Sequence, residues 1–142
     1  MYNYLGTHIY SYKCNTKLLK FNNSLNQQVL KKSQSLDWRA VVCSASGEKM
    51  FSAGIDLAQL AGELGAIMGG DDVGRKAFQL RKMILRLQRP FNLIAECPKP
   101  VIAATFGGNI GGAIDLLAAC DIRYCASDAW FTIKEVDVGL GK

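Results

Sequence analysis

The sequence predicts one α/β domain in which short strands alternate with helices. The first observation is composition, because 142 residues of which 49% are hydrophobic suit a single globular domain with a modest core. The second is the recurrence of short apolar runs between amphipathic stretches. The third is a pair of glycine-bearing turns, one around Gly54 and one over 107–112, each of which follows an apolar run and leads into a helical stretch.

Periodicity, apolar runs and turn residues place the elements in order along the chain. They are a short amphipathic helix around Phe21, Leu25 and Val29 that ends before Asp37, a buried strand over 39–44, a turn over 46–49, a glycine-bearing turn over 51–56 and a helix over 57–64. After a loop at 69–72 and a long helix come a buried strand over 101–105, the glycine turn over 107–112, a helix over 111–119, and strands over 122–125 and 130–133 around a turn at 126–128.

The long helix is expected to begin near Val73 and to run towards Cys97. Asp72 precedes it, and aspartate is favoured both as an N-cap and at the positive end of a helix. The apolar positions that we expect to face a core are Phe78, Met83, Ile84, Leu87, Phe91 and Ile94. Pro90 interrupts this pattern, and a mid-helix proline costs about 3 kcal/mol. The sequence therefore predicts a kink or break beside Arg89.

Composition and spacing exclude several classes of function. The net charge of +5 favours an anionic small molecule or else reflects a solvated basic surface, but the scattered basic residues form no nucleic-acid motif. His8 is the single histidine and the five cysteines form no C-x-x-C pair, which argues against a metal site. No apolar run is long enough to span a bilayer. Asn109 occupies the second glycine position of a dinucleotide-binding fingerprint, so that fold is not expected either.

The two glycine turns favour a site that stabilises negative charge. Each turn can supply one backbone N–H group, and we choose those of Ile55 and Gly112 as donors to a shared oxyanion on a thioester or ester carbonyl. Losing one such donor typically costs roughly 3 kcal/mol of transition-state stabilisation. The alternative is that both turns only allow tight strand-to-helix packing.

Two isolated carboxylates accompany these turns. Asp115 lies on a mostly apolar helix, where desolvation would raise its pKa and the helix N-terminus would lower it. Glu135 follows the strand over 130–133. Together they suggest proton transfer, although Asp115 alone could serve helix-end electrostatics and Glu135 alone could be a solvated surface residue. Asp121 and Arg123 are interpreted as a structural ion pair.

Several motifs resemble the enoyl-CoA hydratase/isomerase (crotonase) superfamily. They are residues 51–57 (FSAGIDL), 97–104 (CPKPVIAA) and 107–116 (GGNIGGAIDL), and within the superfamily residues 70–73 (GDDV), 120–125 (CDIRYC) and 134–140 (KEVDVGL) are similar to its Δ3,5-Δ2,4-dienoyl-CoA isomerase branch. The resemblance implies a crotonase-like spiral of ββα units. It divides the chain into a divergent N-terminal segment, 1–20, and a partial crotonase-like domain, 21–142.

The resemblance also implies an activity and a role for each site residue. The activity is conversion of 3,5-dienoyl-CoA into 2,4-dienoyl-CoA in fatty-acid β-oxidation. The implied roles are an oxyanion hole made by the N–H groups of Ile55 and Gly112, a base at Glu135 that removes the C2 proton, an assisting acid at Asp115, and contacts to the CoA moiety at Ala53, Gly54, Asp56 and Gly108. Hydratases carry glutamate at the position of Asp115, so the isomerase is favoured over the hydratase. No separate cofactor is expected, because coenzyme A is part of the substrate.

The resemblance further implies parts that the sequence lacks. A third catalytic aspartate is expected immediately after Lys142, and the C-terminal helices that build the family's trimer lie beyond it. We therefore expect an incomplete copy of an enzyme whose complete form is a homotrimer or hexamer in mitochondria or peroxisomes. The alternatives are a noncatalytic short product that only binds acyl-CoA or partner subunits, and an enoyl-CoA hydratase. Missing elements would leave apolar surface exposed.

Overall fold

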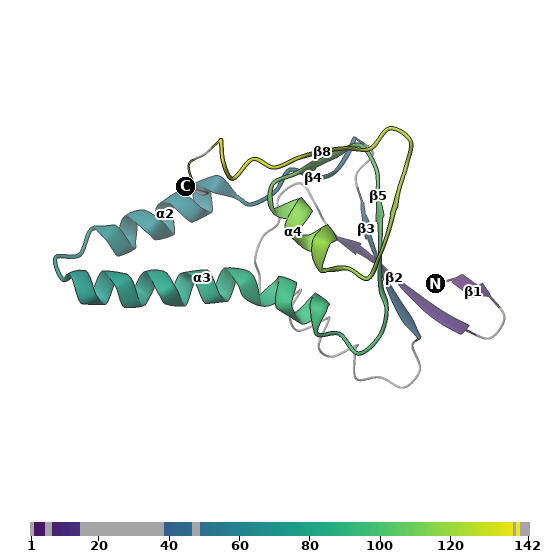
Figure 1. Cartoon of the computed structure of the whole chain (residues 1–142), viewed down its shortest axis with the longest axis horizontal. Coiled ribbons are helices and arrows are strands. Elements are labelled where there is room, and N and C mark those ends of the chain that lie inside the picture. Colours follow the sequence, from purple (N-terminus) through teal and green to yellow (C-terminus); the bar gives the residue numbers. More distant parts are fainter. Residues whose placement is uncertain (1, 5–6, 15–38, 47–48, 138, 140–142) are drawn as a thin grey trace.

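The computed structural model describes residues 2–4, 7–14, 39–46, 49–137 and 139 (Figure 1). The strands in this part of the chain are β1 (Tyr2–Tyr4), β2 (Thr7–Cys14), β3 (Ala40–Ala45), β4 (Met50–Ser52), β5 (Val101–Thr105), β6 (Gly108–Ile110), β7 (Ile122–Cys125) and β8 (Trp130–Thr132). The helices are α2 (Leu57–Met68), α3 (Val73–Ala95) and α4 (Gly112–Ala119). Strands and helices alternate, so the predicted α/β class is confirmed.

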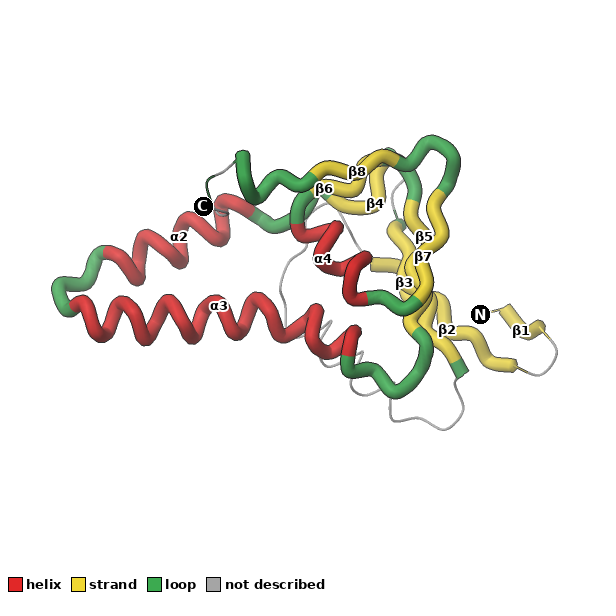
Figure 2. The backbone as a smooth tube through the Cα atoms, in the orientation of Figure 1, coloured by secondary structure: helices red, strands yellow, loops and turns green. Residues whose placement is uncertain are grey.

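The strands form two sheets that the chain visits in turn (Figure 2). One sheet has the order β1-β2-β3-β5-β7 and the other has the order β4-β6-β8. The successive pairs β3/β4, β5/β6 and β7/β8 each give one strand to the first sheet and the next strand to the second. Pairing is parallel from β2 onward. This repeated passage between two sheets is the predicted crotonase-like spiral.

The helices α2 and α3 lie side by side and project away from the sheets (Figure 1). The turn between them ends at Asp72, whose Oδ1 accepts a hydrogen bond from Arg75 N at 2.6 Å and caps α3 as predicted. Asp56 caps α2 in the same way, with Oδ1 3.1 Å from Gln59 N. No residue of α2 is buried among the described residues. The helix α2 is therefore held to the rest of the described chain by few apolar contacts.

The hydrophobic core lies where α4 and the last turns of α3 meet the two sheets. Its buried residues are Cys43, Ala45, Phe51, Ile94, Val101, Ala103, Ala113, Leu116, Leu117 and Cys120. The predicted buried strand over 101–105 alternates buried and partly buried side chains, as a strand between two layers does. The core therefore holds both the strand and the helix that flank the glycine turn at 107–112.

The structure corrects two predictions for α3. Met83 and Ile94 are buried as expected, but Phe78 is 64% exposed and Ile84 is 42% exposed. The start of α3 projects beyond the sheets beside α2 (Figure 1), so the described sheets do not cover the side chains there. The predicted break beside Arg89 is also wrong, because α3 continues through Pro90 from Val73 to Ala95, and the alternative of a kink there stays a prediction. Pro90 is buried with the neighbouring core residues, whose packing offsets the hydrogen bond that a proline removes.

Some short elements differ from the prediction. The glycine turns contain the strands β4 and β6, and β1 and β2 occupy a segment for which no strand was predicted. The helix predicted around Phe21, Leu25 and Val29 lies outside the described residues, as do residues 47–48 of the predicted turn.

The predicted ion pair between Asp121 and Arg123 is not formed. Asp121 Oδ2 instead accepts a hydrogen bond from Val101 N at 2.8 Å. Arg123 Nη1 donates to the carbonyls of Leu117, at 3.2 Å, and Cys120, at 2.5 Å. A guanidinium satisfies the free carbonyls at the end of α4, where the helix dipole also favours a cation.

Strands β7 and β8 and the segment that follows β8 present large apolar side chains to solvent. These exposed residues include Ile122, Tyr124, Trp130, Phe131, Ile133 and Val136. No helix in the described part of the chain is long and apolar enough to cross a membrane.

Candidate functional site

An open pocket of about 200 Å³ lies between the two glycine turns and the segment after β8. Its lining residues are Ala53, Gly54, Ile55, Leu57, Ile110, Gly111, Gly112, Lys134 and Glu135. Five of the residues predicted from sequence therefore come together here. The pocket is where the ends of β4 and β6 face the first turns of α2 and α4.

The first glycine turn touches the second through Gly54. This residue has a φ of +90°, which favours glycine. A Cβ atom at Gly54 would lie 2.7 Å from Ile110 O and 3.5 Å from Gly112 N, so only glycine allows this approach. Gly54 N donates to the buried Ser52 Oγ at 3.2 Å, which fixes the turn to the end of β4. The contact brings the backbone segments of the two chosen donors, Ile55 and Gly112, to one pocket.

The second turn is held at Gly111, where φ is +54° and ψ is −120°. Gly111 N donates to Thr132 O at 2.9 Å, which joins the turn to β8. The next residue, Gly112, begins α4, and no side chain caps this helix end. The first N–H groups of a helix have no partner within it and carry the positive end of the helix dipole. The Gly112 N–H is therefore a donor suited to an oxygen that gains negative charge.

The two carboxylates lie on either side of this turn. Glu135 is partly buried, and its Oε1 lies 2.9 Å from the position that a Cβ of Gly111 would occupy. Asp115 lies in the first turn of α4 and remains exposed. Partial burial, and then the charge of Glu135, raise the pKa of Asp115. The direction agrees with the predicted upward effect of desolvation on the pKa of Asp115.

Glu135 is not the solvated partner of its neighbour Lys134. Lys134 Nζ instead binds Asp137 Oδ2 at 2.6 Å, and both of these side chains are largely exposed. Glu135 is left facing the pocket and Gly111. This arrangement favours the functional interpretation of Glu135 over the alternative of a surface ion pair.

Asp56 and Gly108 occupy positions with clear structural contacts. The Asp56 carboxylate caps α2, and Gly108 lies in β6, where a Cβ would come within 2.7 Å of Trp130 Cζ2. Neither residue lines the pocket that contains Glu135. The predicted contacts of these two residues to the CoA moiety stay predictions.

Asn109 supports the site, and the sequence did not predict this role. It is completely buried, and its Nδ2 donates to Gly107 O at 2.9 Å and to Trp130 O at 3.2 Å. Thr105 Oγ1 donates to Asn109 Oδ1. The bond to Trp130 O joins β6 to β8, and the bonds to Gly107 and Thr105 hold the turn between β5 and β6. The signal was an amide inside an otherwise apolar, glycine-rich run, because buried polar groups need partners.

Comparison with known proteins identifies the family to which this fold and pocket belong. The profile of the Enoyl-CoA hydratase/isomerase family matches residues 13–142. The chain therefore belongs to the enoyl-CoA hydratase/isomerase family. Crystal structures of enoyl-CoA hydratases from Bacillus anthracis (24% identity, TM-score 0.75, 96% of this chain and 51% of that one) and Mycobacterium smegmatis (26%, 0.72, 93% and 49%) share its fold.

The similar curated relatives carry a narrower name. The chain is 58% identical to the mitochondrial Delta(3,5)-Delta(2,4)-dienoyl-CoA isomerase of Homo sapiens over 76% of its own length. It is 46% identical to the peroxisomal enzyme of that name from Arabidopsis thaliana over 75% of its length. These matches cover 32% and 38% of the relatives, so the chain spans about a third of their length.

Proposed function

We propose that this chain forms the proton-abstraction half of a site that converts 3,5-dienoyl-CoA into 2,4-dienoyl-CoA. The observation that carries the proposal is the meeting of Ile55, Gly112 and Glu135 at one pocket, with Asp115 close enough for Glu135 to raise its pKa. The similarity to relatives named dienoyl-CoA isomerase supports the same reaction.

The first step is removal of a C2 proton from the bound thioester. Glu135 accepts this proton, and the electron pair of the C2–H bond forms a C1=C2 bond as the carbonyl electrons move onto oxygen, which gives a trienolate conjugated with the C3 and C5 double bonds. The N–H groups of Ile55 and Gly112 donate hydrogen bonds to the carbonyl oxygen, which is more negative in the trienolate than in the substrate. These donors therefore lower the barrier by binding the transition state more strongly than the ground state.

The second step returns a proton at C6, which leaves double bonds at C2 and C4. A second acidic group supplies this proton. Asp115 lies near enough to Glu135 for the charge of Glu135, after burial, to raise its pKa, and we assign it an assisting role beside that base. An aspartate is one methylene shorter than the glutamate that hydratases carry there, which leaves this position less able to activate a water molecule.

The remaining contacts are to the CoA moiety and to other subunits. We assign Ala53, Gly54, Asp56 and Gly108 to the segment that holds coenzyme A, and the net charge of +5 suits its phosphates. No separate cofactor is needed, because coenzyme A arrives with the substrate. By analogy with relatives named mitochondrial and peroxisomal, we place the protein in one of these organelles. We expect it to work as a homotrimer or hexamer.

The test is a product assay on the natural full-length protein. Incubation with 3,5-dienoyl-CoA is expected to give the 2,4-dienoyl-CoA, whose conjugated thioester is followed by ultraviolet absorbance. The Glu135→Gln variant is expected to lose at least about a hundredfold in kcat, because a general base contributes about 10²–10⁴-fold. Water addition to a 2-enoyl-CoA in place of isomerisation would identify a hydratase. Acyl-CoA binding without turnover of either substrate would favour the noncatalytic alternative.

A further inference from the structure

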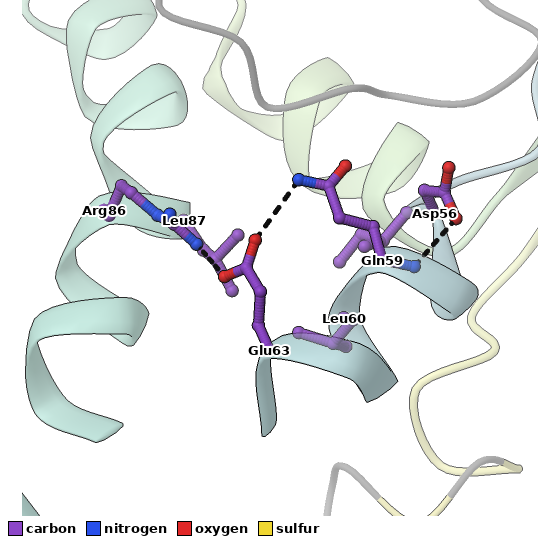
Figure 3. Close-up of a pocket in the computed structure, with 7 residues that line it drawn as sticks. Asp56, Gln59, Leu60, Glu63, Arg86 and Leu87 are labelled. Carbon is purple, nitrogen blue, oxygen red and sulfur yellow. Dashed lines mark hydrogen bonds and ion pairs between the residues drawn. The ribbon is translucent and has the colours of Figure 1, made fainter. Parts of the chain in front are cut away.

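We propose that Arg86 on α3 is a positioning residue for the oxyanion hole, acting through Glu63 and Gln59 on the Ile55 N–H group. Figure 3 shows these side chains in a row between the two helices. The inference rests on the proposed function, since it assigns Ile55 as a donor to the thioester oxygen. It adds a residue that lies outside the pocket where the chemistry takes place.

Ile55 is coupled directly to the start of α2. It precedes the N-cap residue Asp56, whose backbone carbonyl accepts from Leu60 N at 3.0 Å. Asp56 Oδ1 also accepts from Gln59 N at 3.1 Å. Both the backbone and the side chain of Asp56 are thus hydrogen-bonded to the first turn of α2. Because Ile55 precedes Asp56 directly, a tilt of this turn would move the Ile55 N–H group.

The helix α2 depends on polar contacts for its position. None of its residues is buried among the described part of the chain, so apolar packing restrains it weakly. The cross-helix contact comes from Arg86, whose Nη2 binds Glu63 Oε2. The other carboxylate oxygen, Glu63 Oε1, accepts from Gln59 Nε2 at 3.2 Å. Glu63 therefore joins α3 to the turn that Asp56 caps.

Two further observations support this link. Arg86, Glu63 and Gln59 line a small hollow between α2 and α3 that Ile55 also lines. Ile55 lines the pocket of Glu135 as well, so it belongs to both. The hydrogen bond from Arg86, and then that from Gln59, lower the pKa of Glu63. Both hydrogen bonds therefore favour the ionised form of the Glu63 carboxylate, which is the form that pairs with Arg86.

The expected effect of breaking the link is a loss of kcat with KM preserved. An oxyanion donor binds the trienolate more strongly than the neutral thioester, so its displacement weakens binding of the transition state more than binding of the substrate. The Arg86→Gln variant is expected to lower kcat about tenfold and to leave KM within about twofold. A tenfold loss is smaller than the loss in kcat when a whole oxyanion donor is removed, because the donor is displaced and not deleted.

The chain offers a matched control on the same helix. Arg89 Nη1 forms an exposed pair with Glu96 Oε2 at 3.3 Å, and Glu96 follows the end of α3. Arg89→Gln removes the same charge and also breaks one surface ion pair, so it is expected to keep the wild-type kcat. A charge swap that combines Glu63→Arg with Arg86→Glu restores the pairing and is expected to recover most of the lost kcat.

A second readout tests the positioning without any reaction. In amide hydrogen exchange on the natural full-length protein, Arg86→Gln is expected to speed exchange over residues 55–60, and Arg89→Gln is expected to leave it unchanged. Equal exchange and equal kcat in these two variants would overturn the inference, as would a charge swap that fails to recover kcat. Failure of the proposed function looks different, because the unmodified protein would then show no isomerisation whatever the exchange at 55–60.

Discussion

Replacing Gly111 by alanine is expected to weaken both the fold and the catalytic site. Gly111 has a φ of +54° and a ψ of −120°, a region that residues with a Cβ rarely adopt. Strain of this kind costs roughly 1–3 kcal/mol in the free energy of unfolding. The added Cβ would also lie 2.9 Å from Glu135 Oε1, 0.5 Å closer than the 3.4 Å at which ordinary van der Waals contact begins.

This second contact links the substitution to catalysis. The end of a glutamate side chain can move, so the clash is relieved by displacing the carboxylate rather than the backbone. A displacement of a few tenths of an ångström to about 1 Å at a catalytic group lowers the rate by up to about a hundredfold. We therefore expect the kcat for isomerisation of 3,5-dienoyl-CoA to fall by about ten- to a hundredfold.

The measurement pairs urea denaturation with initial rates, and Gly65→Ala is the control. Gly65 lies inside α2, and no described atom approaches within 4 Å of its Cβ position, backbone of its own turn apart. This control is expected to gain roughly 0.5–1 kcal/mol, because alanine is favoured over glycine within a helix. If Gly111→Ala matches Gly65→Ala in both stability and kcat, the assigned geometry of the turn and of Glu135 is refuted.

The remaining predictions concern buried and titrating groups. Asn109→Ala is expected to lower the free energy of unfolding by roughly 2–4 kcal/mol, since three buried hydrogen bonds are lost at about 1 kcal/mol each; a urea-denaturation loss below about 0.5 kcal/mol would contradict this. Because folding raises the pKa of Asp115, the folded protein binds that proton more tightly, and the contribution of this carboxyl to stability falls as pH rises through the folded pKa. In a carboxyl NMR titration, Glu135→Gln is expected to lower the pKa of Asp115 but to leave it above its ordinary value, because burial is the larger cause; an unchanged pKa would show that the two groups do not interact. Burial raises the pKa of Cys120 to about 11, so iodoacetamide at pH 8 is expected to spare it and to modify the exposed Cys125, as peptide mass spectrometry can check.

Local signals in the sequence predicted the elements that local physics controls. Asp72 predicted the start of α3 because a side-chain cap acts within one turn of chain. Apolar runs predicted β3 and β5, which both contribute buried residues to the core. The strands β4 and β6 were missed because they overlap the glycine-bearing segments that were assigned as turns, whereas the equally short β8 was predicted from its aromatic and β-branched residues.

Other properties depend on what lies across from a residue, which local sequence does not contain. The helical period identified the apolar positions of α3, but it could not show that the half with Phe78 projects beyond the sheets. Pro90 looked disruptive because its cost is local, whereas its burial depends on parts of the chain that local sequence does not show.

In the candidate site, too, local sequence indicated the residues but not their contacts. Glycine density and isolated acids indicated which residues to consider, but the contact between Gly54 and the turn at Gly112 joins segments far apart in the chain. Residue chemistry alone left the alternatives of tight packing and solvated acids open, and the family resemblance was needed to choose between them. Asn109 was missed as a support of the site because a single polar residue shows no partner until β8 is placed beside β6.

The central claim is that Glu135 removes a proton from C2, and the most direct test follows that proton. The natural full-length protein is incubated with 3,5-dienoyl-CoA deuterated at both C2 positions, and mass spectrometry follows the loss of label in a single turnover. We predict that the wild-type protein removes one deuterium while Glu135→Gln retains both over the same time. Loss of label at the wild-type rate from Glu135→Gln would contradict the assignment and place the base elsewhere in the site.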